Sequence, residues 1–395
     1  MKKKLLFIMP SLCSGGAEKS LVNLLSVIDS DRYDVDLFLF RREGVFLPSV
    51  PDFVNVTDAG KDYLMFDGDF KSAVIWFLKT GKPSKALARL CYSRALKIKD
   101  ESKRCRILWK YLKTVLPENK TVYDASIGYL ESTSVYYCVE KTTATKHIGW
   151  LHTDYGRIEY QKETDEPHFK QLDALACVSA ECRNIVEKYF PFLKGKTEVI
   201  ENIISPGLIS EMSRKADAFD KKDGETVILT VGRMSPPKGI DNAVKACALL
   251  LKRGYDIKWY HIGKGELLGE TEDLIKSLGV SDRFILLGEK SNPYPYIDKC
   301  DIYVQPSRFE GKSIAIDEAK CLKKPIVSTC FTTVRDQIED GVTGLICDIS
   351  PEGIADKTEL LLKDVSLRKK LSDNLSEEKQ GNEEEALKLY KLIEE

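Results

Sequence analysis

Residues 227–262, VILTVGRMSPPKGIDNAVKACALLLKRGYDIKWYHI, contain the alternation that decides the fold of this chain. The apolar run at 227–231 is short and continuous, which is typical of a strand buried on both faces of a parallel sheet. A loop with glycine and proline follows it, then a helical pattern at 241–252 and a second apolar run at 257–262. This order of strand, helix and strand predicts a βαβ unit.

The same alternation extends in both directions from this stretch. Further strands are expected toward the C-terminus at 284–287, 301–305 and 325–328, with helices at 266–278 and 313–322. Toward the N-terminus the expected elements are strands at 5–8, 35–40, 123–128, 147–151, 174–179 and 199–200, a helix at 17–27 and a helical region at 76–116. Strands that alternate with helices in this way predict an α/β protein with two doubly wound, Rossmann-like lobes and a cleft between them.

The polar stretch at 206–225 has little apolar periodicity and is predicted to be a linker. It would separate an N-terminal lobe at 1–205 from a C-terminal lobe at 226–378. The remainder, 379–395, contains an amphipathic helical pattern, and we expect a final helix that crosses back to the N-terminal lobe.

Composition narrows the class of protein. The chain has 395 residues, of which 43% are hydrophobic and 31% charged, as in soluble globular proteins. Its 11 cysteines form no C-x-x-C pair and it has only four histidines, which argues against a zinc site and suits a reducing cytosol. The apolar run at 5–9 ends at Pro10, too early for a signal peptide, and no later run approaches a membrane span. We therefore expect a cytoplasmic protein.

In open α/β sheets ligands bind at the carboxyl ends of the strands, so candidate site residues are sought there. Gly15 and Gly16 follow the first strand and open a helix, which suits an anion, although a tight turn would need glycine as well. The dinucleotide pattern G-x-G-x-x-G is absent. The second strand ends in Arg41 and Arg42, where a nicotinamide ribose would need an acid.

Two cations lie on the loop that follows the strand at 227–231. Arg233 and Lys238 are five residues apart between Gly232 and Gly239. A guanidinium binds two phosphate oxygens at once and an ammonium adds a point charge, so the pair suits a diphosphate. The alternative is that both are solvated loop charges.

Two carboxylates follow the strand at 301–305. Glu310 lies in the loop, and Glu318 lies eight residues later in the predicted helix. We expect the backbone amides of residues 312–314, namely Lys312, Ser313 and Ile314, to be free at the helix start. Carboxylates for hydroxyls and helix-terminal amides for phosphate fit a sugar nucleotide. The segment at 311–313 is similar to the end of a P-loop, but Pro306 stands where the first glycine of that motif belongs.

Taken together, these motifs resemble the retaining family 4 glycosyltransferases of the GT-B architecture. The segments that carry the resemblance are Gly15-Gly16-Ala17-Glu18, Arg233 with Lys238, Gly263-Lys264-Gly265, Glu310 with Glu318, and Gly341-Val342-Thr343-Gly344-Leu345. They occur in the family's order and extend over nearly the whole chain.

The resemblance implies a role for each residue of the donor site. Arg233 and Lys238 would bind the donor diphosphate and stabilise the leaving group. Glu318 would bind the ribose and Glu310 the transferred sugar. Further donor contacts would come from Gly15, Gly16, Gly263, Lys264, Gly265, Lys312, Ser313 and Ile314. Lys312 departs from the Gly-Phe-Gly-Leu pattern that many relatives have after this glutamate, so the resemblance does not define the transferred sugar.

On the acceptor side, the resemblance implies His152 as the active-site histidine and Glu18 as a second contact. The alternative for His152 is a hydrogen-bonded structural histidine. No Asp-x-Asp lies at a metal-like loop, and we expect Arg233 and Lys238 to replace the ion, so neither a metal nor a cofactor is predicted.

The implied function is transfer of a sugar, with retention, from a nucleotide sugar to a saccharide or lipid-linked saccharide in cell-surface polysaccharide synthesis. A UDP-sugar is favoured and a GDP-sugar is the alternative. Two rival classes are a redox or epimerase enzyme and a non-catalytic protein with a degenerate site. The missing acid after the second strand argues against the first, and the intact set of Glu310, Glu318, Arg233 and Lys238 argues against the second.

One segment is strongly basic although the whole chain has a net charge of -1. Residues 79–120 contain 13 Lys or Arg and 3 Asp or Glu, with interleaved apolar residues that include Trp109 and Leu112 and, just before it, Trp76. Leu108 is another of these interleaved apolar residues. Such a stretch predicts docking on the anionic inner face of a membrane, and the alternative is a solvated helix surface. No nucleic-acid-binding motif accompanies the charge, so no nucleic-acid partner is expected.

Overall fold

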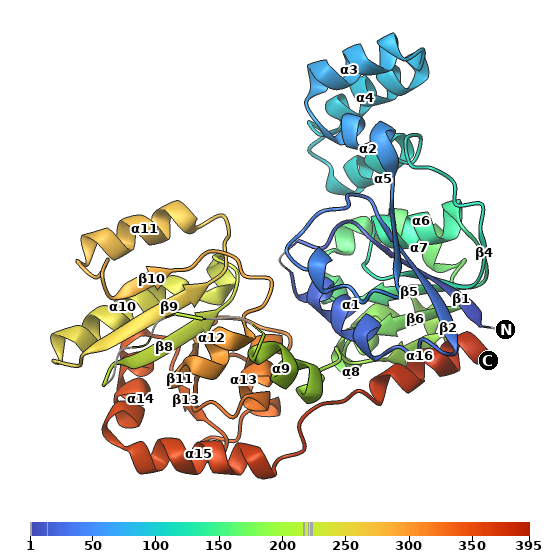
Figure 1. The fold of residues 1–395 in the computed structure, drawn as a ribbon. Helices are drawn as coiled ribbons and strands as arrows, with labels where there is room; N and C mark the ends of the chain where they lie inside the picture. The colour runs from blue at the N-terminus through green and yellow to red at the C-terminus, as the bar shows by residue number, and fades with distance from the viewer. Residues whose placement is uncertain (1, 14, 216–217, 220, 222–223) are drawn as a thin grey trace. The chain divides into compact units, whose positions relative to one another are not determined.

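The computed structural model describes residues 2–13, 15–215, 218–219, 221 and 224–395 (Figure 1). The chain divides into two compact units, each with its own parallel sheet. The first unit comprises Met1–Ile203 and Glu384–Glu395, and the second comprises Ile204–Glu383. The expectation of an α/β protein with two Rossmann-like lobes is therefore confirmed.

The first unit is built on a seven-stranded sheet in the order β3-β2-β1-β4-β5-β6-β7, with every pair parallel. Its strands are β1 (Lys3–Met9), β2 (Tyr33–Leu39), β3 (Asn55–Asp58), β4 (Val122–Gly128), β5 (Thr143–Leu151), β6 (Ala174–Cys177) and β7 (Thr197–Val199). The central strand β1 is paired on both sides, and its residues Leu5–Met9 are fully buried. Burial on both faces explains why this strand has a continuous apolar run.

Helices cover both faces of this sheet (Figure 1). They are α1 (Gly16–Val27), α6 (Thr133–Lys141), α7 (Lys162–Phe169), α8 (Ala180–Tyr189) and α16 (Glu385–Glu394). The last of these comes from the end of the chain. Its Tyr390 stacks on Tyr33 with ring centroids 4.9 Å apart, and the Tyr390 hydroxyl accepts from the Asp29 amide at 2.9 Å. These contacts make the final helix part of the first unit.

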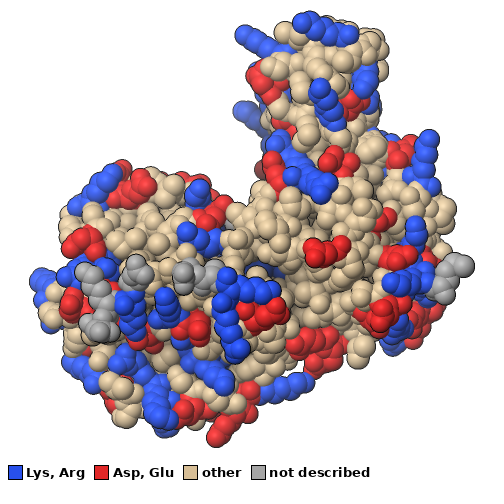
Figure 2. Space-filling view, in the orientation of Figure 1, with Lys and Arg blue, Asp and Glu red and all other residues tan. Residues whose placement is uncertain are grey.

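Four helices between β3 and β4 form a helical projection (Figure 1). They are α2 (Gly60–Asp67), α3 (Phe70–Lys79), α4 (Pro83–Ala95) and α5 (Glu101–Leu112). Two are capped by acids, since Asp69 accepts from Ser72 N and Asp100 from Lys103 N, both at 2.9 Å. The basic stretch thus forms separate helices, and Figure 2 shows Lys and Arg side chains gathered around them.

The apolar residues expected to face a membrane from this stretch are mostly turned inward. Trp109 is 5% exposed and Leu112 9% exposed, because both pack into the core of the first unit. Trp76 packs partly against the same core. The most exposed apolar side chains of the projection are instead Ile75, Leu78, Leu87 and Leu96, which are 53–61% exposed.

The second unit has a six-stranded parallel sheet in the order β10-β9-β8-β11-β12-β13. Its strands are β8 (Thr226–Val231), β9 (Ile257–Ile262), β10 (Phe284–Leu286), β11 (Ile302–Gln305), β12 (Ile326–Thr329) and β13 (Leu345–Cys347). Its helices are α9 (Pro206–Ser213), α10 (Ile240–Lys252), α11 (Leu268–Ser277), α12 (Tyr294–Lys299), α13 (Ile314–Cys321), α14 (Pro351–Lys363) and α15 (Val365–Glu377).

The segment predicted as a linker is largely structured, and that prediction is wrong for its first half. Residues 206–213 form α9, whose first turn is capped by Ser205 Oγ accepting from Leu208 N at 3.4 Å, with Pro206 at its first position. Ile209 is buried, and the helix packs against α12 and α13. The helix is short and has few apolar residues, so periodicity alone does not reveal it. Residues 216–217, 220 and 222–223 lie outside the described residues.

Among the described residues, every helix is too short or too polar to cross a bilayer.

Candidate functional site

Three loops meet at the carboxyl ends of β8, β9 and β11 in the second unit. Backbone hydrogen bonds join them: Gly232 N donates to Ile262 O at 2.9 Å, and Met234 N donates to Lys264 O at 3.0 Å. Arg308 N donates to Pro237 O at 2.7 Å and so attaches the third loop. Segments of the sequence that were identified separately as site candidates therefore form one continuous surface.

Glycine is required where these loops touch. Gly239 has φ +63°, and a Cβ atom there would lie 2.1 Å from the carbonyl oxygen of Pro306. Gly263 has φ +141°, and a Cβ atom would lie 2.0 Å from the carbonyl oxygen of Gly232. At Gly265 the clash would be with Met234 O, at 2.2 Å. These glycines let backbone pack on backbone, and the contact of residues 263–265 with a nucleotide stays a prediction.

Lys238 and Glu310 form an ion pair within this surface. The Lys238 ammonium donates to both carboxylate oxygens of Glu310, each at 2.7 Å. Ser307 Oγ also donates to Glu310 Oε1 at 2.8 Å, and Gln305 Nε2 donates to the same oxygen at 3.2 Å. Glu310 is 7% exposed, so its charge is compensated by several donors in a partly desolvated position.

Arg308 is a residue of this surface that the sequence analysis missed. Its guanidinium donates to Pro236 O at 2.9 Å and to Asp241 Oδ2 at 2.7 Å. Burial alone would raise the pKa of Asp241, but the hydrogen bond and charge of Arg308 lower it below its usual value. Arg308 therefore fixes the loop that carries Lys238, while Arg233 is exposed on that same loop.

Glu318 lies on the buried face of α13. It is fully buried, and its Oε1 accepts from the hydroxyl of Tyr294 at 3.1 Å. Burial and the neighbouring carboxylate raise the pKa of Tyr294 well above its usual value, so the phenol stays protonated and donates. A ribose contact by Glu318 stays a prediction.

The helix start of α13 differs from the expectation. The backbone amide of Ser313 is not free: it donates to Oε1 of Gln337 at 2.8 Å. Gln337 follows the short turn η6 (Val334–Asp336), which the topology places beside the start of α13. This contact joins residues 24 positions apart, and the local sequence carries no sign of it. Lys312 is exposed beside it.

In the first unit, Gly15, Glu18 and His152 lie at the carboxyl ends of the sheet strands. The Glu18 carboxylate lies over Gly15, since a Cβ atom at Gly15 would be 2.0 Å from Glu18 Oε2. Gly16 is the first residue of α1. Ser14 lies outside the described residues.

His152 follows β5 directly and is held by Glu131. Its backbone amide donates to Glu131 Oε2 at 3.0 Å, and its ring lies 5.0 Å from that of Tyr129. Burial lowers the pKa of His152 to about 3, so the imidazole is neutral at physiological pH. Among the described residues, its Nε2 atom has no hydrogen-bond partner.

Glu131 is a second site candidate that the sequence analysis missed. Burial raises its pKa above the usual value, and the charges of Asp165 and Glu18 act in the same direction. A carboxyl group with a shifted pKa at a strand end, next to the predicted histidine His152, is a feature of functional sites. The available signal was its position three residues beyond the strand predicted at 123–128.

Within the described part of the chain, no three His, Cys, Asp or Glu side chains are grouped as metal ligands would be.

Comparison with known proteins agrees with this geometry. Residues 212–378 match the model of the family "Glycosyl transferases group 1". The matched residues lie within the second unit and include all the loops described above except those of the first unit.

Relatives by sequence carry related names. An alpha-D-kanosaminyltransferase from Streptomyces kanamyceticus is 33% identical over 156 residues, 38% of this chain and 40% of that protein. An uncharacterized glycosyltransferase from Haemophilus influenzae is 24% identical over 375 residues, 94% of each chain. The chain spans 40% of the first of these relatives and 64% of a Methanocaldococcus jannaschii glycosyltransferase.

Solved structures share the fold over the full length. Anabaena HepE in complex with UDP and glucose is 16% identical with a TM-score of 0.67, covering 99% of both chains. A mutant of S. aureus TarM, in complex with fondaparinux, alpha-GlcNAc-glycerol and UDP, is 14% identical with a TM-score of 0.67, covering 100% of both chains. The fold of this chain is thus the GT-B fold.

Proposed function

We propose that this chain is a glycosyltransferase that moves a sugar from a nucleotide-sugar donor, with UDP as the favoured nucleotide, to a saccharide or lipid-linked saccharide. The observation that carries the proposal is the Lys238–Glu310 pair at the carboxyl edge of the sheet, inside the matched domain. The pair presents a cation and a carboxylate side by side, which is what a sugar diphosphate requires. Relatives named for capsular polysaccharide biosynthesis and for acting on a diphospho-undecaprenol substrate support the acceptor class.

The chemistry follows from where charge develops. As the bond between sugar and diphosphate breaks, negative charge grows on the leaving phosphate and positive charge on the anomeric carbon. Lys238, with the exposed Arg233 of the same loop, would stabilise the phosphate, because preorganised cations need little rearrangement during the reaction. Glu310 would accept hydrogen bonds from the sugar hydroxyls. Retention of the anomeric configuration is part of the proposal and rests on the family resemblance.

The first unit would bind the acceptor through Glu131 and His152. A neutral imidazole can accept a hydrogen bond from an acceptor hydroxyl, and the raised pKa of Glu131 suits a carboxyl group that shares a proton with a sugar hydroxyl. Glu18 lies close enough to influence the pKa of Glu131 and would contribute a second carboxylate.

Metal-independent catalysis is a further part of the proposal. Two cations on one loop replace the charge that a divalent ion would supply to the diphosphate. A cofactor has no task in this scheme, because the bond energy of the nucleotide sugar drives the transfer.

Helices α3 and α4 of the projection would dock on an anionic membrane where a lipid-linked acceptor lies. Ile75 and Leu78 are both more than half exposed on α3, one turn apart, with Lys71 and Lys79 on the same helix. Apolar side chains that enter the lipid surface, flanked by lysines that meet its phosphates, are the features of an interfacial helix. The protein would then act at the inner face of the membrane, where its 11 free cysteines stay reduced.

The proposed activity is tested by incubating the purified chain with UDP-, GDP- and ADP-sugars and measuring thermal shift and release of free nucleotide. A ligand at 100 times its Kd stabilises the protein by about 2.7 kcal/mol, so the correct nucleotide raises the Tm measurably.

A further inference from the structure

We infer that Gln337 is a positioning residue for the donor, because its side-chain amide holds both backbone groups of Ser313 at the start of α13. The inference rests on the proposed function and adds a residue outside the motifs that carry the family resemblance. It stands on four hydrogen bonds to one buried residue, three to the Gln337 side chain and one to its backbone carbonyl.

The side-chain amide of Gln337 and the backbone of Ser313 exchange two hydrogen bonds. Gln337 Oε1 accepts from Ser313 N at 2.8 Å, while Gln337 Nε2 donates to Ser313 O at 2.9 Å. The same Nε2 atom donates its second hydrogen to Asp317 Oδ1 at 2.7 Å. Only one orientation of the amide meets these three partners, since the reversed group would place a donor against N–H and an acceptor against C=O.

The backbone of Gln337 is also held in place by a hydrogen bond. Its backbone carbonyl accepts from the ammonium of Lys320 at 2.8 Å, and Lys320 also donates to Glu378 at 2.9 Å. Gln337 is 5% exposed and Lys320 7%, so water does not compete for these bonds. Lys320 and Asp317 both belong to α13, and Gln337, from a separate segment, therefore connects the helix to its N-cap residue Ser313.

The hydrogen bonds between Gln337 and Ser313 lie next to Glu310, the carboxylate that contacts Lys238. Residues 310–313 connect Glu310 to Ser313, and Thr333 Oγ1, from the segment that leads to Gln337, donates to Glu310 O at 3.1 Å. One segment thus holds the turn at both ends, at residue 310 and at residue 313. A displacement of that turn would move the start of α13, where donor contacts by residues 312–314 are predicted, and would therefore weaken donor binding.

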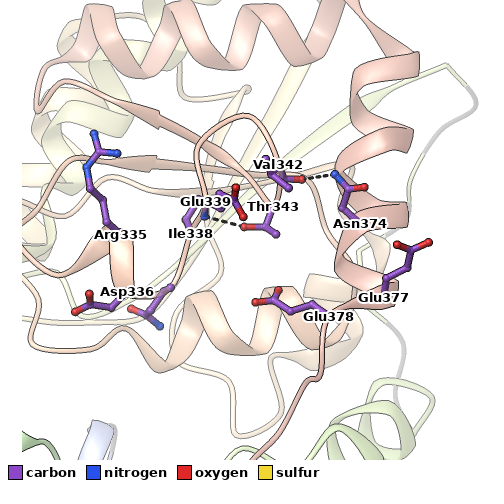
Figure 3. Close-up of a pocket in the computed structure, with 10 residues that line it drawn as sticks. Arg335, Asp336, Ile338, Glu339, Val342, Thr343, Asn374, Glu377 and Glu378 are labelled. Carbon is purple, nitrogen blue, oxygen red and sulfur yellow. Dashed lines mark hydrogen bonds between the residues drawn. The ribbon is translucent and has the colours of Figure 1, made fainter.

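Gln337 is also among the residues that line a cavity of about 430 Å³, whose other lining residues are labelled in Figure 3. The cavity is bordered by the turn of residues 339–343 and by α15, whose Asn374 donates to Val342 O at 2.8 Å. Four carboxylates and Arg335 are among the residues that line it.

The test compares Gln337→Leu, Gln337→Glu and the control Gln171→Leu, which removes an exposed amide that donates to Pro167 O in its own turn. UDP binding is measured by calorimetry, and KM and kcat for the donor are measured by nucleotide release. Gln337→Leu should raise Kd and KM about tenfold, the size of one or two lost hydrogen bonds, with kcat changed less. The control should match the wild type.

The glutamate variant supplies the result that a general loss of packing would not give. At neutral pH the introduced carboxylate faces Asp317 and the Ser313 carbonyl, and it has no proton to donate. These neighbours raise its pKa, so it regains a donor as the pH falls. The charged groups around it are Asp317 and Lys320 from α13, Lys312 just before that helix, Asp336 beside it and Glu378 after α15. Relative to wild type, UDP affinity of Gln337→Glu should recover between about pH 7 and pH 5, whereas Gln337→Leu should not change with pH.

Two failures are distinguishable. A wild-type protein that binds no nucleotide sugar overturns the proposed function and this inference with it. Wild-type affinity in both Gln337 variants at every pH, with only the Tm lowered, overturns the positioning role and leaves the proposed function standing.

Discussion

Lys238 places its ammonium nitrogen 2.7 Å from each of the two carboxylate oxygens of Glu310. The family resemblance implies different partners for these residues, the diphosphate for the cation and the sugar for the carboxylate. Their contact fits the proposed donor, because the two groups are adjacent in a sugar diphosphate. It also means that each residue neutralises the other when both are partly desolvated.

Removing Lys238 should therefore reduce turnover without unfolding the protein. Lys238→Ala is expected to lower kcat about 10² to 10³-fold, by analogy with the loss of one preorganised donor to a developing anion. Glu310 keeps Ser307 and Gln305 as donors, so the second unit should still fold. The control is Lys245→Ala, an exposed lysine with only a 3.6 Å contact to Asp241. Equal turnover in the two variants would contradict the assignment.

Substitutions of Glu318 and of Glu310 should have different effects on UDP binding. Glu318→Gln keeps a partner for the Tyr294 hydroxyl and removes the charge, and we expect weaker binding of bare UDP. Glu310→Gln should bind bare UDP nearly as well as wild type and lose transfer. Calorimetry with UDP, followed by nucleotide release from the sugar nucleotide, measures both. A larger loss of UDP affinity in Glu310→Gln would reverse the roles.

His261 should make the free energy of unfolding decrease as the pH falls. It is fully buried, and burial lowers its pKa to about 3 against 6.5 for an ordinary histidine. Between these values the unfolded chain binds a proton that the folded chain does not, so stability falls as the pH falls. The slope is about 1.4 kcal/mol per pH unit below pH 6.5. Urea unfolding between pH 6.5 and 4.5 should show a shallower decline for His261→Leu than for wild type. Parallel curves would contradict the buried neutral histidine.

Membrane docking should depend on the exposed apolar residues of α3. Ile75→Ser with Leu78→Ser is expected to abolish flotation with vesicles that contain anionic lipid, and binding by the wild type should weaken as salt rises. Leu360→Ser in the second unit, 47% exposed, is the control. Changing the exposed Lys103 and Lys110 to Glu tests the basic helix α5 separately. Equal flotation with neutral and anionic vesicles would count against the electrostatic part of the proposal.

Catalysis should not require a divalent ion. Turnover in excess EDTA is expected to equal turnover in magnesium, since Arg233 and Lys238 supply the charge. Activity that disappears with EDTA and returns with magnesium or manganese would refute this.

Most strands were predictable because each is an apolar run bounded by loop residues, as at Leu5–Ile8 and 227–231. Strand β3 (Asn55–Asp58) was missed because its sequence, NVTD, contains a single apolar residue, and the three-residue strand β13 (Leu345–Cys347) was missed as well. Helix α9 was missed because it is short and depends on Ser205, Pro206 and contacts with α12 and α13. Trp109 and Leu112 were expected at a membrane, but helical periodicity does not tell which face of an isolated helix meets the core.

The site was predictable where it lies in a local motif and not where it depends on distant segments. Lys238 and Glu310 were identified from the loops that carry them, 72 residues apart. Gln337 and Glu131 act through contacts with Ser313 and His152 that only the folded chain brings together.

The central claim is transfer of a sugar from a nucleotide donor, and release of free nucleotide by the purified chain tests it most directly. The wild type should release UDP from at least one UDP-sugar in a panel that includes GDP- and ADP-sugars, and Lys238→Ala should release about 10² to 10³-fold less of it. No release and no thermal shift with any sugar nucleotide, in a wild-type protein shown to be folded, would contradict the account.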